Sequence, residues 1–441
     1  MTKLHITLVV FFVAMFCPSS APAGLVPKRS VLDNGLVLLT SEQRALPMVS
    51  IELLIDAGSR HDGAKREGLA NLTAKLLRDG TKQRTALQIS EALDFLGASL
   101  ETGCGEDVAS ISVTILKKDL STGLELLADI LTSSTFSQGE IDRRKQEIIA
   151  SIRAREEDPG AVAQRTFAAA LFPASPYGRL VEGSEASVKA LQQASLKEFF
   201  ARYYRPNRSI MAVVGDVSEQ DITRALNQAF RGWSKGEPGG QPLVPTKIGA
   251  PQLLRVNRDL TQANIILGHV GVARGNPDYY AIQVMNYILG GGGFSSRLMD
   301  SVRNERGLAY SVYSYFSAEK SHGSFQLVMQ TKNETAQEAM RIANDEIRRI
   351  REEPVSEQEL SDAKDYLIGS FPLRFDTNRK VASFLAQVEY FQLGLDYPER
   401  YGDLIRRVDR AVVQRVAQQY LYPDKLIAVI VGNQQKLGEK K

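Results

Sequence analysis

The chain has 441 residues, of which 43% are hydrophobic and 24% are charged. This composition excludes a disordered or fibrous chain, and the length is sufficient for two or more domains with cores of their own. The formal net charge is only +3, which gives no electrostatic reason to expect binding to nucleic acid or to anionic lipid.

The N-terminus has the three parts of a secretory signal peptide. Lys3 precedes an apolar run from Ile6 to Phe16, and Ala21-Pro22-Ala23 follows as a small-residue cleavage site. The apolar run is too short to span a membrane. We therefore expect cleavage after Ala23 and a secreted, periplasmic protein without a membrane span.

The two cysteines of the chain are Cys17 and Cys104. Cys17 would leave with the signal peptide, so the mature protein would hold one thiol and no internal disulfide. Cys104 lies between two glycines in a strand-like stretch, and no histidine partner is visible in the sequence. We expect this thiol to be inert.

The first half mixes strands with helices. Apolar residues alternate with polar ones at Val49–Ile55 and Ala109–Leu116, which predicts two strands. Helical periodicity predicts helices at Leu120–Leu131 and Ile141–Glu156, and the second helix ends at an acidic-Pro turn. Because strands and helices occur in groups, a mainly antiparallel or mixed sheet is favoured over a doubly wound one.

Between those strands, residues 68–81 read GLANLTAKLLRDGT and predict an amphipathic helix. Positions 71, 74, 75 and 78 are spaced to share one helical face, opposite a stripe of leucines. The simplest interpretation is an ordinary amphipathic helix. The same spacing would also suit a binding site on one helix face, with Asn71, Ala74 and Lys75 as its residues.

The strongest organisational feature is an internal repeat of roughly 200 residues. The segments Leu196–Val217 and Val413–Asn433 both read as a helix, a Tyr, a Pro turn and an apolar strand that ends in Val-Gly. In the second half, Ser324–Gln330 predicts a strand and Thr335–Glu352 a helix. We expect an α/β (α+β) protein of two homologous halves, each a sheet with helices packed on one face.

The Gly- and Pro-rich segment at residues 235–251 has no periodicity and is interpreted as a linker. The predicted organisation is therefore a signal peptide at 1–23, a first domain at 24–234, the linker, and a second domain at 252–441.

The second half also contains four consecutive glycines, Gly290 to Gly293, followed by FSSRLMDSVRNERGLAYSVYS. The glycines lack the Lys-Ser/Thr of a phosphate-binding loop. They are interpreted either as a close-approach loop between helices or as a substrate contact through Gly291, Gly292 and Gly293. An Arg and a Tyr seven residues apart, Arg303 and Tyr310, fit an exposed helix residue and a core residue equally well by spacing alone.

These segments together resemble the insulinase/pitrilysin family of inverted-zincin metallopeptidases, in its branch of roughly 50 kDa that includes the mitochondrial processing peptidase subunits. The resemblance covers nearly the whole mature chain. The family carries H-x-x-E-H on the helix at 68–81, where the two His bind zinc and the Glu activates water. Its first His falls on Asn71, its Glu on Ala74 and its second His on Lys75. Its distant Glu ligand falls on Ser151, 76 residues past Lys75.

The substitutions argue against metal in this chain. A catalytic zinc needs three protein ligands and an open position. Asn is a poor ligand and Ala provides none, while a protonated Lys would repel a divalent ion by about 8 kcal/mol at about 4 Å and an effective dielectric near 20. We expect no cofactor in this chain.

The resemblance gives Arg303 and Tyr310 a role. In the family, the matching Arg and Tyr contact substrate across the cavity from the zinc. An Arg and a neutral Tyr donor together can hold a peptide carbonyl and stabilise its developing oxyanion.

The resemblance therefore implies a non-catalytic subunit of a heterodimeric zinc metallopeptidase. A homologous partner with intact H-x-x-E-H would bring the zinc, and this chain would close the chamber around a peptide or unfolded polypeptide and supply Arg303 and Tyr310. Two alternatives stay open: a catalytically silent structural or assembly subunit, and a homodimeric peptide-binding protein. The presence of Arg303 and Tyr310 favours the first role, and the signal peptide argues against a subunit of the respiratory complex.

Overall fold

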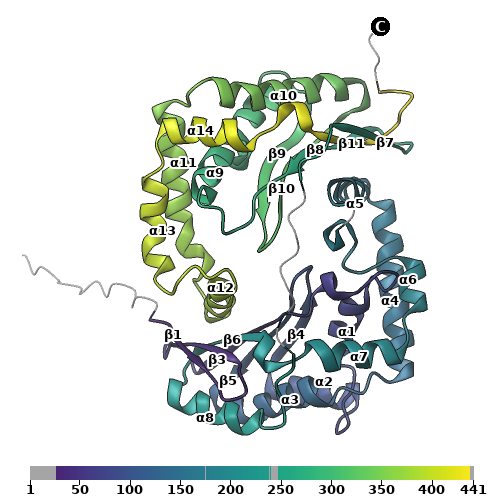
Figure 1. Ribbon diagram of the computed structural model, residues 1–441, viewed down its shortest axis with the longest axis vertical. Helices are drawn as coiled ribbons and strands as arrows, with labels where there is room; N and C mark the ends of the chain where they lie inside the picture. The colour runs from purple at the N-terminus through teal and green to yellow at the C-terminus, as the bar shows by residue number, and fades with distance from the viewer. Residues whose placement is uncertain (1–25, 174, 238, 240–246, 438–441) are drawn as a thin grey trace, which may run out of the picture.

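The computed structural model describes residues 26–437 except residues 174, 238 and 240–246. The predicted signal peptide and the central part of the predicted linker lie outside the described residues. Figure 1 shows the N-terminal half, coloured purple to teal, below the C-terminal half, coloured green to yellow. Each half is built on one sheet, and the described helices include none that is both long and apolar enough to cross a bilayer.

The first sheet has the strand order β1-β2-β6-β3-β5-β4 and the second has the order β7-β11-β8-β10-β9. In the first sheet the strands are β1 (Lys28–Val31), β2 (Val37–Glu42), β3 (Met48–Ile55), β4 (Ser99–Cys104), β5 (Ala109–Leu116) and β6 (Ser209–Gly215). In the second they are β7 (Gln252–Asn257), β8 (Gln262–Val270), β9 (Ala309–Ala318), β10 (Gly323–Lys332) and β11 (Ile427–Gly432).

The two sheets repeat the same topology. In each, the last strand pairs in parallel with one early strand and antiparallel with the next: β6 with β2 and β3, and β11 with β7 and β8. Both of these last strands follow a helix and a Pro-started turn, at Pro206 and at Pro423. The mixed sheets and the internal duplication expected from the sequence are confirmed.

The helices of the first half are α1 (Leu69–Leu76), α2 (Ala86–Leu96), α3 (Leu120–Ser133), α4 (Gln138–Glu157), α5 (Pro159–Leu171), α6 (Glu185–Ala190), α7 (Gln193–Tyr203) and α8 (Glu219–Ala229). Those of the second half are α9 (Tyr279–Asn286), α10 (Ala336–Glu352), α11 (Glu357–Ser370), α12 (Asn378–Tyr390), α13 (Tyr397–Arg406) and α14 (Arg410–Tyr420). The acidic-Pro turn separates α4 from α5, because Asp158 caps the backbone N–H of Gly160 and Pro159 occupies the first helical turn.

Each half also lends a helix to the sheet of the other half (Figure 1). Helix α5 packs on β8 and β11, where Phe167 and Leu171 join a core with Val429 and Val431. Helix α12 packs on β3 and β6 of the first sheet. The sequence predicts helices on one face of each sheet; the structure adds that a helix from the other half covers the second face. The two halves therefore share apolar cores.

Helix α1 differs from its predicted form. It ends at Leu76, so Arg78 lies beyond it and donates to the carbonyl of Leu100. All of its residues except Lys75 are buried, because β4, β5, α4 and α7 surround it. The expected polar face is therefore reduced to one exposed side chain.

Candidate functional site

Three of the four positions that correspond to zinc ligands and base line one pocket of about 230 Å³. Asn71 and Lys75 come from α1, and Ser151 comes from α4, which packs against α1. The sequence separation between them is thus closed by helix packing. The other lining residues are Cys104, Glu147, Ile148, Arg155, Val181 and Glu182. The fourth position, Ala74, is buried and does not line the pocket.

The acidic side chains of this pocket are engaged by arginines. Glu147 forms ion pairs with Arg143 at 2.6 Å and with Arg144 at 2.8 Å. Glu182 is paired with Arg155. In sequence, Glu147 stands one helical turn before Ser151, a spacing that would have identified it as a neighbour of the site.

Two groups of the pocket have no such partner in the described part of the chain. Lys75 forms no ion pair or hydrogen bond there. The side chain of Asn71 is only 8% exposed, and its Nδ2 has no hydrogen-bond partner. A buried amide without a partner is costly and is rare in native structures.

The structure places Arg303 and Tyr310 side by side, in a different part of the molecule. Arg303 lies in a π-helical segment, Met299–Asn304, and Tyr310 lies near the start of β9. The Arg303 guanidinium carbon is 5.2 Å from the centre of the Tyr310 ring and 5.0 Å from that of Phe294. Neither Arg303 nor Tyr310 lines the Asn71 pocket.

Both aromatic neighbours of Arg303 are exposed, Tyr310 by 76% and Phe294 by 73%. Within the described residues Arg303 forms no ion pair, and its hydrogen-bond contact is with Met299 Sδ at 3.9 Å. A guanidinium between two exposed rings is available to a ligand. The sequence did not indicate Phe294 as part of this group.

The glycine segment is tightly packed at three of its four positions. A Cβ on Gly290 would meet the backbone N of Ser314 at 2.6 Å, and Cβ atoms on Gly291 and Gly292 would meet Asn286 and Tyr287 at 2.9 Å. Gly293 has open space and a φ of +58°, which favours glycine. This packing accounts for the glycines as a close-approach turn beside β9; their contact with substrate stays a prediction.

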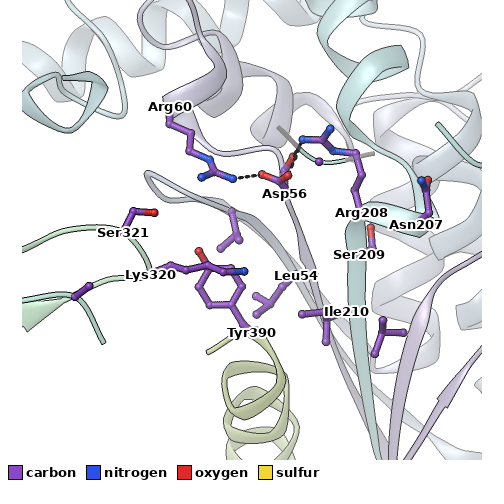
Figure 2. Close-up of a pocket in the computed structure, with 14 residues that line it drawn as sticks. Leu54, Asp56, Arg60, Asn207, Arg208, Ser209, Ile210, Lys320, Ser321 and Tyr390 are labelled. Carbon is purple, nitrogen blue, oxygen red and sulfur yellow. Dashed lines mark hydrogen bonds and ion pairs between the residues drawn. The ribbon is translucent and has the colours of Figure 1, made fainter. Parts of the chain in front are cut away.

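A second pocket, of about 630 Å³, lies between the two halves (Figure 2). Asp56 and Arg60 line it from the first half, and Lys320 and Tyr390 line it from the second. Asp56 accepts hydrogen bonds from Arg60 at 2.6 Å and from Arg208 at 2.6 Å. Burial acts to raise the pKa of Asp56, but hydrogen bonds from His61 and Arg60 outweigh it and lower that pKa well below its usual range.

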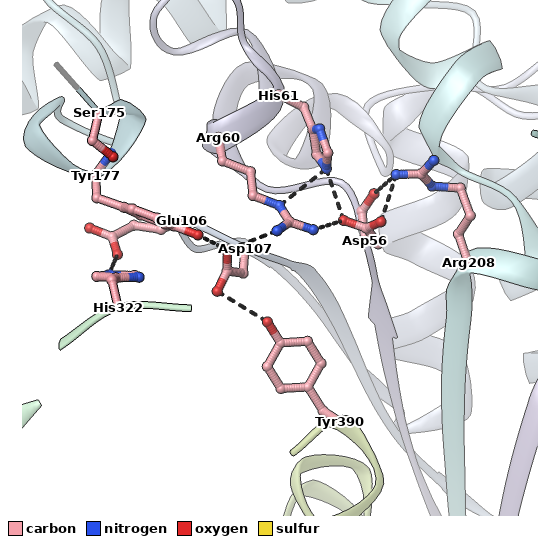
Figure 3. A network of polar contacts seen from close by, with 10 residues as sticks. All are labelled: Asp56, Arg60, His61, Glu106, Asp107, Ser175, Tyr177, Arg208, His322 and Tyr390. Atoms are coloured by element: carbon pink, nitrogen blue, oxygen red, sulfur yellow. Dashed lines mark hydrogen bonds and ion pairs between the residues drawn. The ribbon is translucent and has the colours of Figure 1, made fainter. Parts of the chain in front are cut away.

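A polar network beside this pocket joins the halves (Figure 3). Asp107 accepts hydrogen bonds from the hydroxyls of Tyr177 at 2.8 Å and Tyr390 at 3.1 Å. His322 contacts Glu106 at 3.1 Å and stacks on Tyr177 with ring centres 3.5 Å apart. Because Tyr390 and His322 belong to the second half, these contacts fix how the two sheets face each other.

Comparison with known proteins places the chain in a family. Residues 37–185 match the family model described as insulinase (peptidase family M16), and residues 190–367 match the one described as the peptidase M16 inactive domain. An uncharacterized zinc protease of Streptomyces coelicolor is 30% identical over 349 residues, which cover 78% of this chain and 76% of the relative. The chain belongs to the insulinase family, peptidase family M16.

Further members of the insulinase family resemble the chain over most of its length. An uncharacterized zinc protease of Mycobacterium tuberculosis is 29% identical over 424 residues, or 94% of this chain and 95% of the relative. The crystal structure of a peptidase M16 inactive domain from Pseudomonas fluorescens has a TM-score of 0.88 and 28% identity, and covers 93% of this chain and 98% of that one.

The Asn71 pocket does not fit the zinc that relatives named zinc proteases imply. Asn71, Lys75 and Ser151 offer an amide, an ammonium group and a hydroxyl, in place of the imidazole and carboxylate groups that bind zinc. Among the described residues, no three His, Cys, Asp or Glu side chains are grouped so as to hold a metal ion. The pocket of this insulinase family member is thus lined chiefly by hydrogen-bond donors where metal ligands are expected.

We expect Cys104 to react slowly despite its place on the wall of this pocket. Burial raises the pKa of its thiol to about 12, with a further contribution from Asp62. Relative to an ordinary thiol, this lowers the reactive thiolate fraction at neutral pH about 10³-fold. Alkylation by iodoacetamide at pH 7.5, followed by mass spectrometry of the Cys104 peptide, should be at least about 10²-fold slower in the folded protein than in urea. Equal rates in the two states would contradict this expectation.

Proposed function

We propose that this chain is the zinc-free subunit of a heterodimeric zinc metallopeptidase. A homologous partner with an intact H-x-x-E-H motif supplies the zinc and the base. This chain closes the chamber around a peptide or unfolded polypeptide and supplies Arg303 and Tyr310. It is a secreted, periplasmic protein that lacks peptidase activity when isolated.

The composition of the Asn71 pocket is the observation that carries the proposal. Its residues come from the positions of the family's zinc ligands, and they cannot replace those ligands. Retention of the fold without the ligands favours a role that needs the fold but takes the metal from elsewhere. The Arg303 guanidinium, without an ion pair in the described residues and beside the exposed Tyr310, supports a contribution to a partner's substrate.

A catalytically silent assembly subunit or a homodimeric peptide-binding protein of the same fold is the alternative. The unsuitable donor set of the pocket agrees with these roles as well. The roles differ in the partner, because only the proposed one requires a zinc-bearing homologue. Affinity purification of the tagged chain from its native host, with mass and zinc analysis of what comes with it, should recover a homologue of similar mass that contains zinc. Recovery of the chain only with copies of itself would favour the homodimer.

We expect the isolated chain to bind no zinc stoichiometrically and to cleave no peptide. The fourfold variant Asn71→His, Ala74→Glu, Lys75→His and Ser151→Glu should recover measurable zinc affinity, because α1 and α4 already hold three of these positions around one pocket. Full activity need not follow, since the groups that orient the ligands have also changed. Plasma emission spectroscopy after dialysis against zinc measures the metal content.

The matched control is the double variant Asn71→Ala and Lys75→Ala, which removes the same side chains without adding ligands and should stay free of zinc. One zinc per wild-type chain that is lost in this double variant would show that the assignment of the ligand positions is wrong.

A further inference from the structure

The Asn71 pocket has an excess of unused hydrogen-bond donors. The amide of Asn71 is more than nine-tenths buried, and its Nδ2 has no partner among the residues that the structure describes. Lys75, one helical turn further along α1, lines the same pocket and forms no ion pair there. Ser151 adds a hydroxyl from the facing helix α4. A side chain with unmet donors in a pocket is a candidate for contact with a ligand.

The charge balance of the pocket indicates the sign of that ligand. Glu147 is engaged by two arginines, and Glu182 is engaged by Arg155, which also lines the pocket. Lys75 is therefore the charge of the pocket wall that remains without a counterion. A cation would be repelled by Lys75, whereas an anion would neutralise it and accept hydrogen bonds from its ammonium group.

We infer that the pocket which holds zinc in catalytic relatives binds a carboxylate group of a peptide in this chain. The carboxylate accepts hydrogen bonds from Lys75 Nζ, from the Asn71 amide and from the Ser151 hydroxyl. A volume of about 230 Å³ admits an acidic side chain or the carboxyl end of a chain. The inference rests on the proposed function only for the statement that the ligand is a peptide.

The same residues make a statement about stability. A buried amide without a partner lowers the stability of the free protein, and an apolar side chain of similar shape removes this cost. Asn71→Leu should therefore raise the thermal midpoint of the unliganded chain while it weakens carboxylate binding. A residue kept only for packing would not show these two opposite effects.

Fluorescence anisotropy of three labelled peptides with the isolated full-length chain tests the inference. The peptides share a Gly-Ser-Ala sequence with a blocked N-terminus: one ends in a free carboxylate, one in an amide, and one in an amide with a single internal Glu. At low salt we expect at least one acidic peptide to bind about tenfold or more tightly than the neutral amide, the size of a charge-assisted hydrogen bond. Preference for the free C-terminus or for the Glu peptide identifies the source of the carboxylate.

Lys75→Met should abolish the preference for acidic peptides, and Lys75→Arg should restore part of it. Asn71→Leu should reduce the preference, and Asn71→Asp should reduce it further by repulsion. Lys118→Met, at an exposed lysine outside the pocket, is the matched control and should leave the preference unchanged.

Equal binding of all three peptides by the wild-type chain would overturn the inference, as would an acid preference that persists in Lys75→Met. Because these measurements use no partner, a negative result leaves the heterodimer proposal intact. Conversely, failure to recover a zinc-bearing partner would leave carboxylate binding standing.

Discussion

Arg303→Ala is expected to lower the peptide cleavage rate of the assembled pair about 10²-fold, the scale for losing one donor to a developing oxyanion. The guanidinium lies between the exposed rings of Tyr310 and Phe294 and forms no ion pair with the described residues. Its removal therefore leaves no buried charge unpaired, so the fold and the pairing should survive. The loss should appear mainly in kcat, because an interaction that strengthens in the transition state affects rate more than binding.

Tyr310→Phe keeps the ring and removes only the hydroxyl donor. If the hydroxyl contacts substrate, this variant should also lose activity, with an unchanged thermal midpoint because Tyr310 is mostly exposed. Arg306→Ala is the matched control. Its guanidinium is engaged by Glu305 at 2.6 Å and by the Ser301 carbonyl at 2.7 Å, and it should change turnover little.

Steady-state kinetics of the purified pair, with size-exclusion chromatography to verify pairing, is the measurement. If Arg303→Ala and Tyr310→Phe both leave turnover unchanged while the pair still forms, the two residues are structural, and the assembly role becomes the better explanation.

The features that the sequence predicted well are those written in local pattern. The helix, Tyr, Pro and strand sequence occurs twice, and it yields β6 and β11 at equivalent places in the two sheets. Strand β5 begins and ends at the predicted residues, Ala109 and Leu116, because its burial alternates strictly. The fixed separation between Lys75 and Ser151 also carried over, since it reflects where α1 and α4 meet.

The features that were missed depend on contacts between distant segments. Helix α5 has an apolar face, but nothing in its sequence states that the face covers the sheet of the other half. Likewise, His322 and Glu106 lie more than 200 residues apart, so their contact has no local signal. The burial of α1 on nearly all sides escaped prediction because Asn71 and Thr73 are polar residues that the surrounding elements enclose.

Two π-helical segments flank the glycine-rich turn and hold Arg303, and they too were outside what periodicity predicts. They run from Tyr287 to Gly291 and from Met299 to Asn304. Such segments arise when one extra residue is accommodated in a helix, and they are frequent at functional sites. Their position next to Arg303 and Tyr310 agrees with the proposed role of this face of the second half.

The coupling of the two halves leads to the largest expected effect on stability. Phe167 of α5 is fully buried against the second sheet, and its ring lies so close over β8 that a Cβ on Gly268 would meet its Cζ at 2.6 Å. Phe167→Ala removes this ring and leaves a cavity between the halves. We expect the free energy of unfolding to fall by about 3–5 kcal/mol.

Urea unfolding followed by two signals measures this loss and shows where it acts. Trp233, the single tryptophan, is buried in the first half, while far-ultraviolet circular dichroism follows both halves. Because α5 belongs to the first half and β8 to the second, the midpoint should fall in both signals. Phe95→Ala is the matched control: this ring on α2 is 91% exposed, and its removal should change the free energy of unfolding by no more than about 0.5 kcal/mol. If Phe167→Ala costs no more than Phe95→Ala, then α5 does not hold the two sheets together, and the closed arrangement of the halves needs another cause.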